Sequence, residues 1–308
     1  MMSGLKKSVF HQINRSRVYN RIIEYRFRDR VENATADKAL PFSIQVKYEN
    51  ALKRLPHPEG LLHPQNFFFN KANQRAFLES IGAPLVPVEY QGELSYFDGL
   101  KDGEYVIKPV KGCSARGVVP FDICQGKFEV NGKSLDLTAF KAFIKAEIGD
   151  DRLLVEVRVQ DKYFGDLMDY KVYLFLVSGA DHVICIQRSD GKTGATYSAA
   201  GKNMDIGKYR KKPLRDEPPA EAIHSAVELA LQLQKKIPLS FVRLDFYVTQ
   251  SGVYVGEITP IPGDSGQFYP AYDLEMGRKW MKSRLYLRQH PEGFSGVEFF
   301  ARSRLRMF

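Results

Sequence analysis

Two short strands joined by a turn are predicted over residues 241–266, and this segment constrains the chain more than any other. Polar and apolar residues alternate along both strands, and residues two apart share one face of a strand. Arg243 and Asp245 therefore share a face of the first strand, and Glu257 and Thr259 share a face of the second. A hairpin of these strands brings two carboxylates together beside a cation.

The two carboxylates need neutralisation, because burying a charge among apolar residues is costly unless it is paired. Mg²⁺ is one solution, since it binds one or two carboxylates together with phosphate oxygens. A salt bridge between Arg243 and Asp245, with Glu257 at the surface, is the other. The hairpin alone leaves both interpretations open. Strict alternation in the second strand also places Val255 on the face of Glu257.

A glycine-rich turn follows another predicted strand in the segment 106–117, VIKPVKGCSARG. The strand carries Lys108, and the turn contains Gly112, Ser114 and Gly117. Successive backbone amides in such a turn bind anions, and a nearby lysine adds a point charge for phosphate. The spacing matches neither the phosphate loop that opens a helix nor the dinucleotide-binding pattern. An ordinary hairpin with a glycine-rich turn is the alternative.

Two further predicted strands carry charged residues among apolar ones. Glu156 interrupts the apolar run 153–160, and Asp169 and Lys171 share a face in the segment DYKVYLF. The backbone and carboxylate of the first strand suit an adenine base, and the aspartate and lysine of the second suit ribose and phosphate. Cross-strand ion pairs, each worth little, are the alternative interpretation.

Length and composition favour a globular protein. The chain has 308 residues, which favours about two domains, and an ordinary hydrophobic content of 44%. No window reaches the ~18 to 20 apolar residues of a membrane span, and the N-terminus lacks the apolar segment of a secretory signal. The cysteines Cys113, Cys124 and Cys185 are odd in number and not spaced as metal ligands. These features favour a reducing cytoplasm without a disulfide framework.

Positive charge is concentrated at the two ends of the chain, whose net charge is +9. Such a field attracts anions, including nucleotides, acidic polymers, nucleic acids and anionic membranes. This pattern predicts either an interfacial amphipathic helix or a helix packed on its own domain with a solvated basic face. The apolar residues that run through the N-terminal basic cluster at roughly helical spacing are Val9, Phe10, Ile13, Val18, Ile22 and Ile23.

Periodicity and turn residues predict the remaining elements. Residues 1–55 are expected to be helical, and the polar segment 191–219 is expected to be a long functional or mobile loop. Further helices are expected at 71–82, 134–148 and 221–236, and further strands at 85–88, 105–110, 118–121, 153–159, 170–177 and 182–186.

The order of these features resembles the ATP-grasp superfamily. The features are the strand lysine with its glycine-rich turn, the strand glutamate, the DYK strand, and the ending R-x-D-F…G-E-x-T-x-x-P-G. The segments FVRLDFY, VYVGEIT, FYP and LEMG are most similar to the TupA-like ATP-grasp proteins, which are associated with bacterial surface polysaccharides, including polyglutamate–polyglucuronate. The resemblance covers about residues 70–282.

The resemblance implies an α+β chain with the ATP-grasp fold, in which two α+β subdomains clasp ATP, preceded by a basic helical N-terminal extension. It places this basic helical region at 1–60, a small segment before the ATP-grasp domain at 61–104, the ATP-grasp domain at 105–290 and a basic tail at 291–308. Within the ATP-grasp domain, residues 105–160 would carry the lid, and residues 161–290 would carry the metal and substrate site.

The resemblance also implies a nucleotide site. Lys71 and Lys108 would contact the phosphates, Glu156 the adenine amino group, and Asp169 the ribose. The backbones of the residues that follow the glutamate would complete the adenine site, and a mobile loop would close over the phosphates. The adenine backbone groups belong to Val157 and Val159, and the loop contains Gly112, Ser114, Ala115 and Gly117.

Metal binding and catalysis are implied at the hairpin and the strands beside it. Asp245, Glu257 and Thr259 would bind Mg²⁺ or Mn²⁺, with Thr259 at a position where the family commonly has asparagine. The residues implied in catalysis are Arg243, Arg188 and Lys171.

The implied activity is that of an ATP- and Mg²⁺-dependent carboxylate–amine ligase, which forms an amide through an acyl phosphate. Its substrates would be an acidic surface polysaccharide, uronic acid or peptide and an amine donor, with no specific nucleic acid partner. An ATP-grasp phosphotransferase and a nucleotide-binding module without turnover are the alternatives. The expected location is the bacterial cytoplasm, and peripheral association of the basic ends with the inner membrane and a homodimer are left open.

Overall fold

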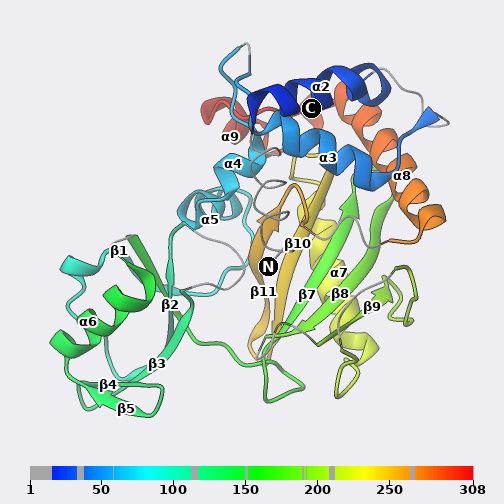
Figure 1. Ribbon diagram of the computed structural model, residues 1–308. Coiled ribbons are helices and arrows are strands. Elements are labelled where there is room, and N and C mark those ends of the chain that lie inside the picture. The colour runs from blue at the N-terminus through cyan, green and yellow to red at the C-terminus, as the bar shows by residue number, and fades with distance from the viewer. Residues whose placement is uncertain are drawn as a thin grey trace, which may run out of the picture.

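The computed structural model describes residues 16–32, 38–57, 59–111, 117–149, 152–188, 191, 193–207, 212–263 and 268–307. These residues form two antiparallel sheets with surrounding helices, which confirms the expected α+β class (Figure 1). The strands are β1 (Val88–Glu93), β2 (Gly103–Pro109), β3 (Val119–Cys124), β4 (Lys127–Val130), β5 (Lys133–Leu135), β6 (Arg152–Val157), β7 (Met168–Phe175), β8 (Gly179–Gln187), β9 (Gly194–Ser198), β10 (Phe241–Thr249) and β11 (Gly252–Thr259). The helices are α2 (Arg17–Glu32), α3 (Phe42–Leu52), α4 (Pro64–Phe68), α5 (Lys71–Ser80), α6 (Leu137–Ile148), α7 (Ala220–Gln234), α8 (Pro270–Gln289) and α9 (Val297–Arg302).

The six-stranded sheet has the order β1-β6-β2-β3-β4-β5 and packs one face against α6. Phe140 of α6 stacks on Phe128 of β4 with ring centroids 4.3 Å apart. The helix begins at Leu137, later than expected, because the Asp136 side chain accepts the Ala139 N–H at 2.8 Å and caps it. The residues just before this cap form β5 instead.

The five-stranded sheet has the order β11-β10-β7-β8-β9, and α7 covers one of its faces. On that face, Val172 of β7 and Leu244 of β10 share a buried core with Ile223 and Ala226 of α7. The expectation of an uninterrupted loop over 191–219 is wrong, because β9 pairs with β8 within it. Five residues between glycine-rich and lysine-rich turns are too few to give a clear alternating pattern.

The strand expected at 85–88 is displaced toward the C-terminus. The observed strand, β1, begins at Val88, whereas Leu85 forms only an isolated bridge with Val255. Pro84 precedes the expected strand and Pro87 lies within it, and proline has no N–H to donate to a ladder. This placement joins β1 to the six-stranded sheet through β6.

The opposite face of the five-stranded sheet has an apolar end, which the terminal helices cover. Phe241 and Phe175 pack beneath Phe42 of α3 and Trp280 of α8. The ring centroid of Phe42 lies 5.0 Å from that of Phe241 and 5.1 Å from that of Trp280. The helical N-terminal region therefore completes the core of the sheet that follows it.

Polar contacts also join α3 to α8. Arg284 of α8 is 2% exposed and donates Nη2 to the Glu49 Oε1 atom at 2.8 Å. Burial raises the pKa of Glu49, but the charge of Arg284 and the contact with His63 outweigh it and hold the pKa well below its ordinary value. Near the first residues of both helices, the Asp273 Oδ1 atom of α8 accepts a hydrogen bond from the Ser43 N–H of α3 at 2.8 Å.

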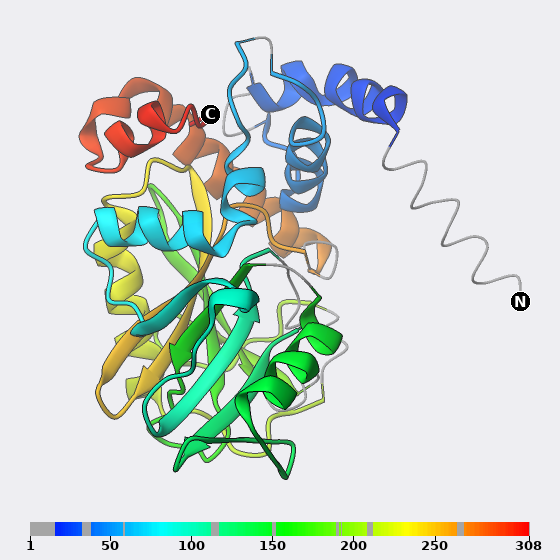
Figure 2. The ribbon, with the colours of Figure 1, turned by 90° about the vertical axis from the view of Figure 1, so that its left-hand side faces the viewer.

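The C-terminal segment packs on the same body of the protein (Figure 2). Phe300 and Leu305 are buried in the core of the five-stranded sheet, and the Leu62 N–H donates to the Arg304 carbonyl oxygen at 2.7 Å. Residues 291–307 are therefore anchored, while the domain boundaries themselves stay a prediction. Among the helices of the described ranges, none is both long and apolar enough to cross a membrane.

The Gly277→Ala substitution is expected to destabilise the protein by about 2 to 3 kcal/mol, because α8 crosses the backbone before α3 at this glycine. A Cβ at Gly277 would lie 2.0 Å from the Leu40 carbonyl oxygen and 2.9 Å from the Phe42 nitrogen. Helix propensity alone would make alanine more stable than glycine by about 1 kcal/mol. A loss of unfolding free energy in the variant would therefore point to the close crossing. Urea unfolding measures it, with Gly293→Ala as the control because no atom lies within 4 Å of its Cβ position. Equal midpoints for the two variants would contradict the close crossing.

Candidate functional site

The β10–β11 hairpin has the predicted register at its charged residues. Arg243 pairs with Thr259, and Asp245 pairs with Glu257, so the two carboxylates lie opposite each other beside the arginine. The Asp245 residue is 3% exposed, whereas Glu257 is exposed. The predicted meeting of two carboxylates and a cation is therefore observed, with one carboxylate inside and one accessible.

A β-bulge at Gly256 corrects the predicted alternation of β11. Phe246 pairs with Val255 although Asp245 pairs with Glu257, so Gly256 is an extra residue on this strand. Val255 is consequently buried on the core face and does not share the face of Glu257, as strict alternation predicts. A Cβ at Gly256 would lie 2.8 Å from the Tyr247 ring, which explains the glycine. Bulges of this kind re-aim side chains beside functional sites.

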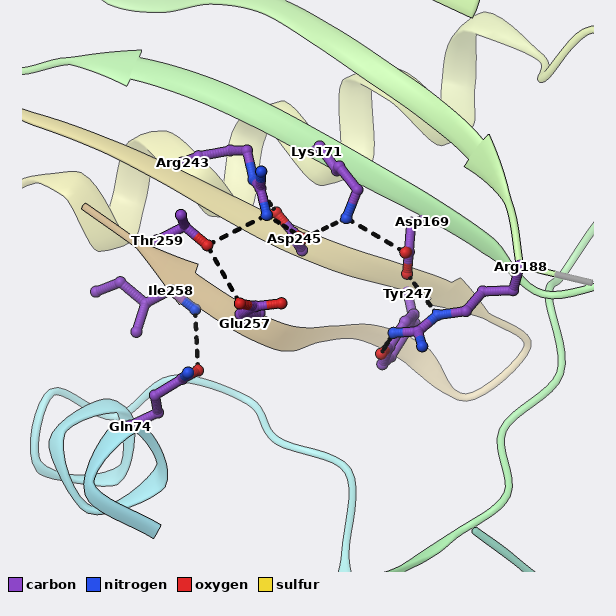
Figure 3. Close-up of polar contacts among 10 residues, drawn as sticks. All are labelled: Gln74, Asp169, Lys171, Arg188, Arg243, Asp245, Tyr247, Glu257, Ile258 and Thr259. Carbon is purple, nitrogen blue, oxygen red and sulfur yellow. Dashed lines mark hydrogen bonds and ion pairs between the residues drawn. The ribbon is translucent and has the colours of Figure 1, made fainter. Parts of the chain in front are cut away.

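A row of alternating charges crosses the face of the sheet from β10 to the end of β8 (Figure 3). Arg243 donates Nε and Nη2 to the two carboxylate oxygens of Asp245 at 2.7 and 2.9 Å. Lys171 donates to Asp245 and also lies 3.3 Å from an Asp169 carboxylate oxygen. Arg188 donates Nε to Asp169 at 2.9 Å. All five residues are sequence-predicted site residues, and the fold brings them together.

Asp245, Arg243 and Lys171 are each held in the ionised form by their neighbours. Burial raises the pKa of Asp245, but Arg243 and Lys171 outweigh burial and lower this pKa below its ordinary value. Burial lowers the pKa of Arg243 and of Lys171, but the neighbouring carboxylates outweigh it and raise both values. These three residues are therefore charged at neutral pH, and the two cations among them can stabilise an anion without being protonated first.

The donor set at the hairpin fits a magnesium ion that shares its coordination with phosphate. The Thr259 hydroxyl accepts from Arg243 Nη2 at 3.2 Å and lies 3.4 Å from a Glu257 carboxylate oxygen. Asp245, Glu257 and this hydroxyl supply oxygen donors only, and the accessible one is Glu257. Within the described residues, no group of three His, Cys, Asp or Glu side chains converges as metal ligands. Mg²⁺ commonly takes one or two carboxylates and completes its shell with phosphate and water.

The second half of the predicted site lies on the six-stranded sheet. Lys108 of β2 and Glu156 of β6 form an ion pair at 2.5 Å. Both line a pocket with Lys71, the first residue of α5, and Val255 and Gly256 of β11 also line this pocket. The pocket therefore spans the two sheets, and three predicted nucleotide-binding residues share it.

The pKa of Tyr247 shows that the two halves share one electrostatic environment. Burial raises this pKa, Arg188 opposes the change, and the carboxylates of Asp169, Glu156 and Asp245 raise it further. Glu156 comes from the six-stranded sheet, and the other charges come from the five-stranded sheet. Tyr247 therefore lies within reach of charges from both sheets.

The other predicted nucleotide-binding residues that the structure describes, Val157, Val159 and Gly117, do not line this pocket. The Val157 N–H donates to the Pro87 carbonyl oxygen at 3.1 Å, and Val159 is half-buried just after β6. Gly117 has φ +71°, a conformation that favours glycine, and its Cβ position lies 3.3 Å from the Pro109 ring. Gly112, Ser114 and Ala115 of the predicted loop lie outside the described residues.

A family model for TupA-like ATP-grasp proteins matches residues 62–281 of this chain. The chain belongs to the TupA-like ATP-grasp family. The match spans both sheets and every site residue named above, from Lys71 to Thr259. The resemblance inferred from the order of motifs is therefore confirmed.

Solved structures similar to this TupA-like ATP-grasp protein have low sequence identity. D-alanine–D-alanine ligase from Bacillus anthracis is 15% identical, with 73% of this chain and 69% of that chain covered and a TM-score of 0.43. The Helicobacter pylori D-alanine–D-alanine ligase is 15% identical, with coverages of 79% and 66% and a TM-score of 0.42. D-cycloserine synthetase DcsG is 13% identical, with coverages of 72% and 71% and a TM-score of 0.40. No match was found among curated proteins.

Two residues of the TupA-like site are absent from the sequence-based candidates. Tyr247 accepts from Arg188 through its hydroxyl, and its ring lies 5.3 Å from the Arg188 guanidinium carbon. Gln74 lines the pocket and accepts the Ile258 N–H at 3.2 Å, which ties α5 to β11. Tyr247 could have been predicted, because it lies two residues after Asp245 and so shares a strand face with it. Gln74 could not, because no local pattern marks a buried glutamine on a helix.

Proposed function

We propose that this protein is an ATP- and Mg²⁺-dependent carboxylate–amine ligase that forms an amide through an acyl phosphate. The observation that carries the proposal is the row of fixed charges from Arg243 to Arg188 beside a pocket containing Lys71, Lys108 and Glu156. ATP would lie between residues 105–160 and 161–290, which we propose as the two subdomains. Membership of the TupA-like ATP-grasp family supports this placement.

The proposed nucleotide contacts follow the charges around the pocket. Lys71 and Lys108 would bind the phosphates, and Glu156 and the backbone of Val159 would bind the adenine base. Asp169 would contact the ribose. Lys108 pairs with Glu156 in the structure, so nucleotide binding would redistribute this ion pair between phosphate and the adenine amino group.

In the proposed reaction, the γ-phosphoryl group of ATP moves to an oxygen of the substrate carboxylate, and ADP leaves. The amine nitrogen then attacks the carbonyl carbon of the acyl phosphate, and inorganic phosphate leaves as the amide forms. Arg243 and Lys171 would stabilise the charge that develops on the transferred group, with Arg188 at the end of the row. These cations are already oriented by Asp245 and Asp169, so little reorganisation is needed during transfer.

A bound Mg²⁺ would supply charge neutralisation at the phosphates. Asp245, Glu257 and Thr259 would hold it, and Glu257 is the accessible carboxylate of the set. Mn²⁺ has similar oxygen-ligand preferences and is a candidate substitute.

An acidic acceptor, such as a uronic acid, an acidic surface polysaccharide or an acidic peptide, is the proposed carboxylate substrate. The net charge of +9 supports this class, as does the association with bacterial surface polysaccharides that the resemblance to TupA-like proteins implies. The test measures ADP and phosphate released from ATP with panels of uronic acids, acidic peptides and amines. Release of both products that depends on the amine supports the ligase. Phosphate retained on the acceptor would instead identify a phosphotransferase, and ATP binding without turnover would identify a binding module.

The Lys108→Ala substitution is expected to weaken ATP binding at least ~tenfold, because hydrogen bonds to charged groups contribute about 1.5 to 3 kcal/mol. Calorimetric titration of the ATP analogue AMP-PNP measures the affinity without turnover. Lys127→Ala is the matched control, since Lys127 is exposed on β4 of the same sheet. Lys108→Arg should retain most of the affinity. Identical dissociation constants for wild type and Lys108→Ala would remove this lysine from the site.

A further inference from the structure

The helix α2 is apolar on two opposite sides. On its inner side, Ile23, Phe27 and Val31 are buried in a cluster with Tyr48 and Ala51 of α3. Spacings of four residues place these three side chains on one face of the helix. This inner face explains why α2 is anchored to the protein, and it matches the packed-helix interpretation of the N-terminal pattern.

The outer side of α2 carries a second apolar stripe that the core does not use. Val18 is 71% exposed, Ile22 is 56% exposed and Tyr25 is 88% exposed. These residues follow one another at spacings of four and three, so they form a continuous stripe opposite the buried face. The sequence pattern groups Ile22 with Ile23, whereas the structure assigns them to opposite sides. A surface helix packed on a core normally has a polar outer face.

Arginines surround this stripe. Asp29 is an exposed acid four residues after Tyr25, and Glu24 lies beneath Arg21 and Arg28, which lower its pKa although burial raises it. The five arginines of α2 outnumber its three acids, Glu24, Asp29 and Glu32, so the helix has a net charge of +2. The preceding sixteen residues add Lys6, Lys7 and Arg15 and contain no acidic residue. The exposed arginines of α2 are Arg17, Arg21, Arg26, Arg28 and Arg30.

We propose that the outer face of α2, defined by Val18, Ile22 and Tyr25, is a docking surface for an anionic phospholipid membrane. An apolar stripe flanked by arginines is the arrangement of helices that lie in a membrane interface. The stripe would enter the boundary between headgroups and acyl chains, and the arginines would contact lipid phosphates. Tyrosine suits this depth, because its ring is apolar and its hydroxyl remains hydrated.

The geometry leaves the active site free while the membrane is bound. Figure 2 shows α2 at one end of the molecule, with its inner side against α3, and the β10–β11 hairpin belongs to the body of the protein beyond it. Docking through α2 would hold the enzyme at a surface without covering the pocket. The inference is independent of the proposed ligase activity, because none of its residues belongs to the site.

The test is co-sedimentation of the full-length protein with vesicles. Wild type is expected to bind vesicles of mixed phosphatidylcholine and phosphatidylglycerol and to bind pure phosphatidylcholine vesicles at least ~tenfold more weakly. The triple variant Val18→Gln, Ile22→Gln, Tyr25→Gln should lose at least ~tenfold in binding to the anionic vesicles. Glutamine keeps the arginines in place and is a good helix former, so the helix is retained.

The matched control replaces Val177, Leu231 and Tyr286 with glutamine, since these are exposed apolar residues on other surfaces. It should bind anionic vesicles as wild type does, and circular dichroism should match for all three proteins. Equal vesicle binding by the triple variant and wild type would overturn the proposal, including the case in which residues 1–15 alone bind lipid. A second outcome would also overturn the proposal: the wild type is a dimer, the triple variant is a monomer, and neither protein binds vesicles. That outcome would assign the stripe to contact with a second copy of the chain.

Discussion

The Glu257→Gln substitution is expected to lower ATP turnover by at least ~100-fold while leaving the free energy of unfolding unchanged. Glu257 is exposed on β11, and its register partner Asp245 is already held by Arg243 and Lys171. Removing the charge of Glu257 therefore leaves no buried cation unpaired. It does remove the accessible carboxylate of the proposed metal site, on which phosphoryl transfer would depend.

Turnover is measured as ADP formed at Mg²⁺ and ATP concentrations that saturate the wild type, and folding is measured by urea denaturation. Glu228→Gln is the matched control, because it removes an exposed carboxylate from the surface of α7. The control should retain wild-type turnover. A Glu257→Gln variant with wild-type ATP consumption would show that the carboxylate has no part in the reaction. Raising the Mg²⁺ concentration should partly restore a variant whose defect is metal affinity.

The Asp245→Asn substitution is expected to destabilise the fold by about 3 to 5 kcal/mol, the usual cost of removing one partner from a buried ion pair. Asp245 accepts hydrogen bonds from both Arg243 and Lys171. With a neutral amide in its place, these two cations would remain close together in a buried setting without the charge between them. Urea denaturation at neutral pH measures the change, and Asp216→Asn at an exposed position is the control. Equal stability of the two variants would show that the row does not depend on this charge.

The difference in unfolding free energy between wild type and Asp245→Asn is expected to change with pH in a defined direction. The pKa of Asp245 is lowered in the folded protein, so its contribution is present above the unfolded pKa of about 3.9 and is lost as the pH falls through the folded value. Wild type should therefore lose stability relative to Asp245→Asn on acidification. Asp181 also titrates at acidic pH, since burial raises its pKa but contacts with His182 and Lys279 outweigh burial and hold the pKa at about 2. It is present in both proteins, so the difference between them isolates Asp245. A constant difference from neutral to strongly acidic pH would contradict the assignment.

The charged strands were predictable because alternation is a local property of the sequence. Arg243, Asp245 and Lys171 stand on the expected faces, and strand pairing brings them together. The bulge at Gly256 was not predictable in the same way, because it depends on how β11 pairs with β10 and on the position of the Tyr247 ring. One extra residue moved Val255 into the core while Glu257 kept its face.

Contacts between distant segments account for the rest of what the sequence did not reveal. Arg188 meets Asp169 only because β7 and β8 pair, and Gln74 meets Ile258 only because α5 lies on the edge of β11. The burial of Leu305 was likewise hidden, since the C-terminal segment is rich in arginine and its apolar residues have no clear period. Such contacts are set by tertiary packing, which a local pattern does not encode.

The contribution of α3 to the sheet has a consequence for how the protein can be divided. The family match begins at residue 62, yet Phe42 lies on Phe241 and Trp280, and Glu49 neutralises the buried Arg284. A fragment that starts at the family boundary would expose two large aromatic rings and leave a buried guanidinium without its counter-charge. The region that defines the family is therefore smaller than the unit that packs around one core, and α3 is an internal part of that unit rather than an appendage.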